Sequence, residues 1–145
     1  HPLPLRSFST FTYSLVDIGA RRFFSVHPTT QLWFAPPATR CVVQTEYLIN
    51  PGAYEGRKPG DATNGVAFAL HEIRRDGSRR TLFQRLLDPV ANAADRGVQK
   101  LRMEITIAAD SELLFETTPG PDGNWAYDWA MVGPFSIEPQ QTTSP

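Results

Sequence analysis

The sequence has very little cysteine. Its 145 residues include a single one, Cys41, so the chain cannot close a disulfide within itself or form a Cys-X-X-Cys metal or redox motif. Cys41 lies in the apolar run TRCVVQTEYLI, where a thiol is usually buried and structural. Cysteine usage fits both a reducing cytosol and an exported domain without disulfides, and does not decide between them.

The sequence also has no excess of charge of one sign and no long apolar run. Its 14 Lys and Arg against 15 Asp and Glu give a formal net charge of -1, which provides no long-range attraction for nucleic acid or an anionic membrane. We therefore predict no nucleic-acid partner. No stretch approaches the roughly 18 apolar residues of a membrane helix, and no cleavable signal is visible, so we predict no membrane insertion of this segment.

A sustained helical period is absent as well. The 13 prolines and 10 glycines interrupt the chain, and no segment keeps apolar residues at helical spacing for three turns. What is present instead are short apolar or β-branched runs bounded by proline or glycine, which are typical of strands. The predicted strand regions are 7–13, 30–36, 40–49, 65–89, 98–107, 111–119 and 130–138.

Region 65–89 is predicted to be a β-hairpin, because alternating apolar residues flank an Asp76-Gly77 turn. About eight short strands without βαβ alternation favour an all-β fold, an antiparallel β-sandwich of jelly-roll type with little helix. Residues 88–99, DPVANAADRGVQ, are predicted to be a loop with at most one helical turn. The length suits one domain, which we place at 1–138, followed by a linker-like tail at 139–145.

Alternation with polar neighbours predicts which side chains fill the core. We also expect Trp129 there, because large aromatics usually fill β-sandwich cores and the closing strand holds Val132, Phe135 and Ile137. The residues predicted from alternation are Val66, Phe68, Leu70, Leu101, Met103, Ile105, Leu113 and Phe115.

The segment GPDGNWAYDWAMVGPF, residues 120–135, is the first candidate binding site. A sugar presents apolar C–H faces and a rim of hydroxyls, so its site needs an exposed aromatic ring beside groups that hydrogen-bond in pairs. Asn124, Trp125, Tyr127 and Asp128 supply these types within five positions. We expect Trp125, next to a glycine-rich turn, to offer its ring to the ligand.

The connection DPVANAADRG adds Asp95 and Arg96 to the candidate ligand-binding residues. The planar fork of Arg96 suits a carboxylate or a pair of sugar hydroxyls. A structural role has strong support and can coexist with ligand binding, because an arginine paired with Asp88 or Asp128 would hold a long loop against the sandwich.

The stretch from NGVAFALHEI to DWAMVGPFSI resembles the NPCBM family of carbohydrate-binding modules and related jelly-roll accessory domains of bacterial surface or glycan-processing proteins. The resemblance follows the order of GVAFALHE, TLFQRLLD, KLRMEITI and ELLFETT, then a polar loop and the Asp128-Trp129-Ala130 element. It implies a jelly-roll fold and a noncatalytic role in binding sugar. The chain departs from the family where Met131-Val132-Gly133 follows that element, and the N-terminal third carries no family motif.

Metal and catalytic sites have weaker support in the sequence. The three histidines, His1, His27 and His71, are widely scattered and form no zinc motif, and the loop aspartates lack calcium-site spacing, so no metal or cofactor is predicted. Asp95 and Asp128 are the one carboxylate pair that a glycosidase could use. No nucleophile-elbow, zinc-protease or phosphate-loop motif accompanies them, and we predict no enzymatic activity.

The chain begins at His1 and ends in EPQQTTSP, which resembles a linker, so we interpret it as a piece of a longer protein. The leading hypothesis is a noncatalytic carbohydrate-binding accessory domain of an exported or cell-surface bacterial protein, with a glycan or the neighbouring domains as partners. The alternative is a structural or protein-interaction module without a small ligand, since one fold serves many roles.

Overall fold

The computed structural model describes residues 5–9, 15–58, 60–120 and 127–140. Regular structure within them is almost all strand, and the two helical pieces are single 3-10 turns, η1 Pro51–Ala53 and η2 Ala93–Asp95. The predicted scarcity of helix is confirmed, and η2 lies in the loop where one turn was expected. No described helix is long and apolar enough to cross a membrane.

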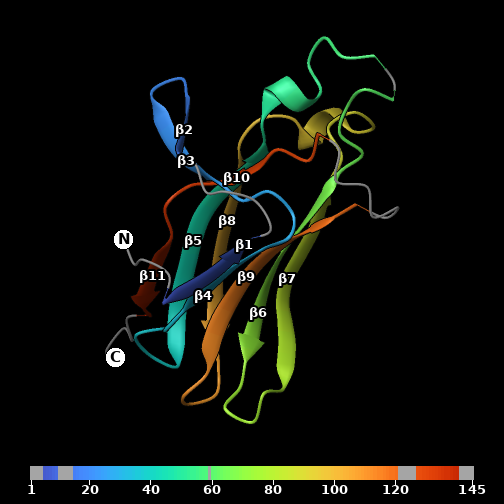
Figure 1. Cartoon of the computed structure of the whole chain (residues 1–145). Coiled ribbons are helices and arrows are strands. Elements are labelled where there is room, and N and C mark those ends of the chain that lie inside the picture. Colours follow the sequence, from blue (N-terminus) through green and yellow to red (C-terminus); the bar gives the residue numbers. More distant parts are fainter. Residues whose placement is uncertain (1–4, 10–14, 59, 121–126, 141–145) are drawn as a thin grey trace.

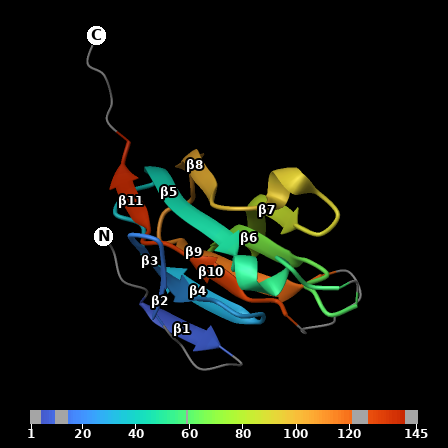
Figure 2. The same cartoon turned by 90° about the horizontal axis from the view of Figure 1, so that it is seen from above.

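The strands form two antiparallel sheets that pack face to face, as Figures 1 and 2 show. The first sheet has the order β1-β4-β9-β6-β7, with β1 Arg6–Ser9, β4 Thr30–Phe34, β9 Glu112–Pro119, β6 Val66–Ile73 and β7 Arg79–Leu87. The second has the order β11-β5-β10-β3-β2, with β8 paired to β5; its strands are β2 Leu15–Ile18, β3 Arg21–Ser25, β5 Arg40–Ile49, β8 Gln99–Thr106, β10 Ala130–Val132 and β11 Ser136–Pro139.

The strand order is that of a jelly roll. Eight consecutive strands, β3 to β10, are divided between the sheets so that β3-β10-β5-β8 faces β4-β9-β6-β7, and only the hairpin strands β6 and β7 follow each other within one sheet. This is the arrangement of two interlocked Greek keys, and it confirms the predicted all-β sandwich. β11 adds to the edge of the second sheet as far as Pro139, one residue past the predicted domain end.

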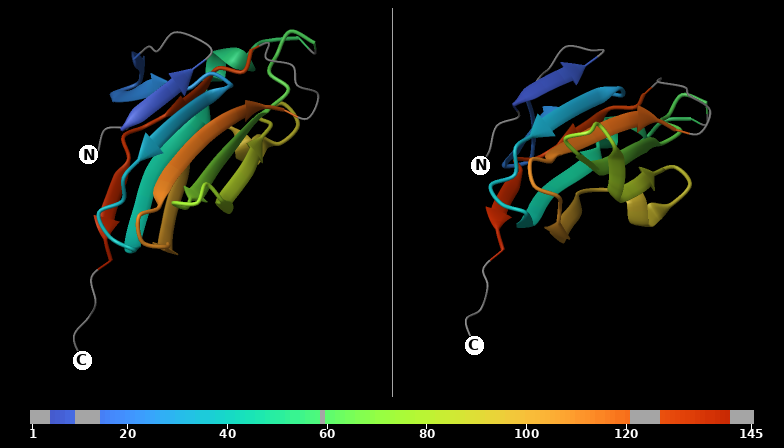
Figure 3. Two further views of the ribbon diagram at one scale, coloured as in Figure 1. Left: turned by 60° about the horizontal axis from the view of Figure 1, so that its bottom comes forward. Right: turned by 90° about the horizontal axis from the view of Figure 1, so that it is seen from below.

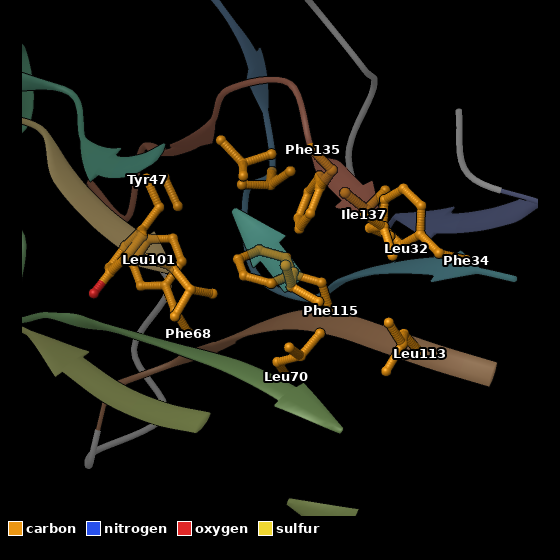
Figure 4. Close-up of a cluster of buried hydrophobic side chains, with 14 of the residues drawn as sticks. Leu32, Phe34, Tyr47, Phe68, Leu70, Leu101, Leu113, Phe115, Phe135 and Ile137 are labelled. Carbon is orange, nitrogen blue, oxygen red and sulfur yellow. The ribbon is translucent and has the colours of Figure 1, made fainter. Parts of the chain in front are cut away.

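The core lies between the sheets and is rich in aromatic rings (Figure 4). Tyr47 and Phe68 contact across it with ring centres 4.9 Å apart. Phe135 follows the Gly133-Pro134 break and points into the core. Its ring centre lies 4.6 Å from that of Phe34 and 5.1 Å from that of Phe115. Complete burial of such a side chain contributes about 1.5 to 3 kcal/mol, so these rings carry much of the packing free energy.

Most of the core predicted from alternation is confirmed. Val66, Phe68, Leu70, Leu101, Ile105, Leu113 and Phe115 are buried, and Met103 is partly buried against the same cluster. Cys41 is also buried, and its thiol donates to the Ala38 carbonyl at 2.9 Å. The hairpin is confirmed as β6 and β7, and Asp76 Oδ1 accepts from the Ser78 amide in the turn.

The hairpin of β2 and β3 was not recognised from the sequence. It pairs with β10 and brings Phe23 onto the face of the second sheet that points away from the main core. There Phe23, Leu48 and Met131 are buried together. This small second cluster explains why Leu48 and Met131 can be apolar at positions that alternate away from the main core.

Candidate functional site

Three connections meet at one end of the sandwich. Residues 50–65 join β5 to β6, residues 88–98 join β7 to β8, and residues 127–129 lead into β10. They lie at the same end because β5, β7 and β9 all run toward it, and they stay side by side in the views of Figures 1 and 3. Loops held by a rigid sandwich are where binding residues usually occur.

Two of the predicted site residues, Asn124 and Trp125, lie outside the described residues. Tyr127 is half-buried at this end, with a left-handed backbone φ of 59°. Asp128, the next residue, is fully buried. Burial argues against the predicted contact of Asp128 with ligand, because its side chain has no access to solvent in this structure.

Asp128 instead joins two of the loops. Its Oδ1 accepts a hydrogen bond of 2.8 Å from the Thr63 hydroxyl, and the Gly65 amide donates to that hydroxyl at 3.1 Å. Thr63 is itself buried. A buried carboxylate needs such donors to offset the loss of water, so Asp128 stabilises the contact between residues 127–129 and 50–65.

The prediction that Trp129 fills the core is wrong. Ala130 and Val132 face the core from β10, so alternation directs Trp129 outward, where 37% of it is exposed. Its ring lies against η1: a methyl group built on Gly52 would be 3.3 Å from Trp129 Cζ3.

Arg57 connects the aromatic residues to loop 50–65. Its guanidinium carbon lies 4.3 Å from the ring centre of Tyr127 and 5.0 Å from that of Trp129. Its Nε donates to the Gly52 carbonyl at 2.6 Å and its Nη1 to the Asp61 carbonyl at 3.4 Å. The sequence reasoning missed Arg57, since the run YEGRKPGD carries no binding motif and only the fold brings it to the rings.

A pocket of about 420 Å³ opens beside this cluster, between loops 50–65 and 88–98. We call it the loop pocket. It combines apolar surface with three charged side chains, which is the composition of a site for a polar ligand with apolar faces. The lining residues are Tyr54, Glu55, Gly56, Arg57, Ala62, Pro89, Val90 and Arg96.

Arg96 is exposed and lines the loop pocket, as a ligand-binding role requires. Its Nε donates to the Pro89 carbonyl at 2.7 Å, so it also holds its own loop, through a carbonyl rather than through Asp88 or Asp128. Tyr54 of loop 50–65 connects the two loops that form the pocket, because its hydroxyl accepts from the Gly97 amide of loop 88–98 at 3.3 Å.

Asp95 does not line the loop pocket, and its burial argues against the predicted contact with ligand. It is buried, with Oδ1 accepting from Arg85 Nη2 at 2.8 Å and Oδ2 from the Asp88 amide at 3.0 Å. Burial raises the pKa of Asp95, but the bonds from the Asp88 amide and Arg85 outweigh it and hold the pKa below its ordinary value. Asp95 therefore holds loop 88–98 in place, through Arg85 of β7 and the Asp88 amide.

The carboxylate pair considered for a glycosidase is not arranged across an open cleft. Asp95 and Asp128 are both buried, each engaged by donors of the protein, and neither lines the loop pocket. Within the part of the chain that the structure describes, no three His, Cys, Asp or Glu side chains are grouped as metal ligands.

A polar network covers part of the outer face of the first sheet, and the sequence reasoning did not identify it. The His71 ring lies 2.9 Å from the Thr81 hydroxyl and 3.0 Å from Glu116 Oε1. Arg79 and Gln31 donate to the two oxygens of Glu116 at 3.2 and 3.3 Å. Since these groups already bond one another, the network stabilises strand pairing and is a weaker candidate for ligand binding than the loop pocket.

Comparison with known proteins supports the fold and leaves the family open. No protein-family model matches the chain. Over 92 residues it is 29% identical to an uncharacterized protein of Archaeoglobus fulgidus, a match covering 62% of this chain and 22% of that protein. The NPCBM resemblance therefore stays a prediction.

The structure is similar to an arabinose-bound α-L-arabinofuranosidase, MgGH51, with a TM-score of 0.53 and 11% sequence identity. This likeness covers 92% of this chain and 22% of the arabinofuranosidase. At that identity it concerns the fold alone. In both comparisons the chain spans about a fifth of the similar protein's length.

Proposed function

We propose that this chain is a noncatalytic carbohydrate-binding domain that holds a glycan at the loop pocket. The observation that carries the proposal is the lining of that pocket: the Tyr54 ring and Val90 supply apolar surface, while Glu55, Arg57 and Arg96 supply an acceptor and planar donors. Sugars are recognised by this combination of ring faces and paired hydrogen bonds.

Trp129 extends the surface beside the pocket. Its partly exposed ring is joined to the pocket wall through Arg57, which contacts Trp129 and lines the pocket. A glycan of more than one residue would place one sugar in the loop pocket and a second against Trp129. Carbonyl bonds and ring contacts hold Arg57 before ligand arrives, which lowers the entropic cost of binding.

The two similar proteins are consistent with an accessory role in a longer protein, since this chain spans 22% of each. The arabinofuranosidase has arabinose bound, and this chain corresponds to 22% of it. We therefore include in the proposal that the chain serves a larger bacterial protein, exported or on the cell surface, whose activity lies outside this domain.

A carbohydrate microarray with the isolated chain tests the proposal. We expect binding to a limited set of glycans, and we expect Trp129→Ala and Arg57→Ala to weaken it. Arg75→Ala is the matched control, because Arg75 is 84% exposed in the turn at the opposite end of the sandwich. Binding that survives both site variants would remove the loop end as the glycan site, and an empty array would contradict the function.

The second candidate function is an interaction module that contacts neighbouring domains. It is favoured by the β2–β3 hairpin, where Leu15 and Phe24 are cross-strand partners and are 56% and 38% exposed. Adjacent exposed apolar side chains mark contact surfaces. If Leu15→Ser disrupts association with the rest of the protein while the array stays empty, this function replaces glycan binding.

A further inference from the structure

We propose that the glycan held at the loop pocket is an acidic one, and that Arg57 and Arg96 bind the carboxylate of a uronic acid residue. This inference rests on the proposed function and narrows it to one class of sugar. Its basis is the way charges are paired across the described residues, which leaves both arginines of the loop pocket without an acidic partner.

Most described arginines have a carboxylate close by. Every ion pair of the described residues within 4.0 Å that involves arginine lies outside the loop pocket. Arg40, Arg57 and Arg96 have no carboxylate within that distance in the described parts of the chain, and two of these three line the same pocket. The paired arginines are Arg21, Arg22, Arg74, Arg75, Arg79, Arg80, Arg85 and Arg102.

The two pocket arginines bond to neutral groups instead. Arg57 donates to the carbonyls of Gly52 and Asp61, and Arg96 donates to the carbonyl of Pro89. These bonds fix each guanidinium in place without cancelling its charge. In the described structure, Nη2 of Arg57 and both Nη atoms of Arg96 have no hydrogen-bond acceptor, so donors of both side chains are left for a ligand.

The third charged side chain of the pocket, Glu55, limits how many anionic groups the ligand can carry. Glu55 is exposed and is the acidic residue of the lining, and it makes no ion pair with either arginine within 4.0 Å. It would repel a ligand carrying several anionic groups, but its oxygens can accept from sugar hydroxyls. Two arginines and one glutamate thus suit a ring with one carboxylate and several hydroxyls.

A carboxylate matches this pair of donors in geometry. The planar guanidinium fork binds the two oxygens of a carboxylate side by side, through bonds stronger than those to a neutral hydroxyl. Tyr54 and Val90 would contact the apolar face of the same ring. A sulfate or phosphate ester offers related acceptors with a different shape, so the experiment must separate these anions.

The test is isothermal titration of the chain with oligosaccharides of polygalacturonate, alginate and hyaluronan, each paired with its carboxyl-reduced form. Sulfated neutral oligosaccharides form a further arm. We expect at least one acidic oligosaccharide to bind about 10- to 100-fold more tightly than its reduced form, the ratio that corresponds to hydrogen bonds with a charged group. Added salt should reduce this ratio.

The variants are Arg57→Gln and Arg96→Gln, with Arg40→Gln as the matched control because Arg40 is also exposed and lacks a carboxylate partner. We expect the first two to lose the preference for the acidic form and the control to keep it. Arg96→Gln is the decisive variant, because the exposed side chain bonds only to the Pro89 carbonyl of its own loop, and thermal melts verify that the fold is kept.

The possible results separate the two proposals. Equal binding of acidic and reduced forms, or a preference for the sulfated sugars, overturns the uronic acid inference and leaves the glycan function standing. A preference that survives Arg96→Gln also overturns the inference. Absence of binding to every acidic and neutral glycan contradicts the proposed function itself.

Discussion

The guanidinium of Arg57 lies 4.3 Å from the ring centre of Tyr127, and this contact joins two connections that each cross from one sheet to the other. Loop 50–65 starts from β5 of the second sheet, whereas the chain reaches Tyr127 after leaving β9 of the first. A cation over an aromatic face contributes about 0.5 to 2 kcal/mol. Because Arg57 also lines the loop pocket, the residue that holds the loops together is one that a ligand would meet.

Replacement of Trp129 should reduce the stability of the fold less than replacement of a core aromatic residue. Trp129→Ala is expected to lower the free energy of unfolding by about 1 to 2 kcal/mol, because only part of its surface is buried. Phe68→Ala, at a fully buried ring, should cost about 3 to 5 kcal/mol. Urea unfolding at neutral pH measures both. Equal losses for the two variants would show that Trp129 is a core residue after all.

Glu72 should make the fold sensitive to acid. The carboxylate is fully buried and accepts from Arg80 Nε at 2.9 Å, the Ala108 amide at 2.7 Å and the Ser111 hydroxyl at 2.8 Å. Burial raises the pKa of Glu72, but the bonds from Ala108, Ser111 and Arg80 outweigh it, so the pKa in the folded protein is below its ordinary value of 4.5.

A lowered pKa means that the folded state binds the Glu72 proton less tightly than the unfolded chain. The stabilisation by Glu72 is then complete above about pH 4.5 and is lost as pH falls through the folded-state pKa. Glu72→Gln should cost about 1.5 to 3 kcal/mol at pH 7 and flatten the acid side of the stability profile. Glu104→Gln, at an exposed carboxylate, is the control and should leave the profile unchanged.

Asp95 should order loop 88–98 without contacting ligand. Asp95→Asn removes the charge that Arg85 pairs with and puts an amide group where the Asp88 amide and Arg85 both donate. We expect a stability loss of about 1.5 to 3 kcal/mol and faster hydrogen exchange at the Asp88 amide. Asp110→Asn, at a 71% exposed carboxylate, should change neither. Unchanged exchange at Asp88 would remove Asp95 from its positioning role.

A comparison of alanine variants at Gly65 and Gly77 distinguishes the cost of backbone strain from the cost of a steric clash. Both have left-handed φ angles, 112° and 86°, but a methyl group on Gly65 would lie 2.9 Å from the Leu87 carbonyl oxygen, whereas Gly77 has open space around it. Gly77→Ala should cost about 1 to 2 kcal/mol for the backbone conformation alone. Gly65→Ala should cost clearly more, measured by thermal unfolding. Equal costs would mean that the Leu87 carbonyl moves aside freely.

Some features of the site were accessible from the sequence. Arg96 was predicted to bind ligand and lines the loop pocket, and the loop at 88–99 was predicted to hold at most one helical turn, which is η2. Asp95 was predicted to bind ligand, whereas its carboxylate bonds Arg85 and the Asp88 amide of its own protein. Whether a loop carboxylate binds a ligand or its own protein depends on which donor lies opposite, and Arg85 reaches Asp95 from a neighbouring strand.

The sequence by itself determined the sandwich, because strand alternation and turn residues are local. Val66, Phe68 and Leu70 had to face one side of their strand, and Asp76-Gly77 had to turn the chain. Only the tertiary structure decided that Trp129 faces outward, that Asp128 is buried against Thr63, and that Arg57 reaches Tyr127. Each of these depends on which face of the sheet the residues at the ends of the strands point to. Each also depends on loops that come into contact only after folding. Since such contacts join residues far apart in the chain, no local pattern encodes them.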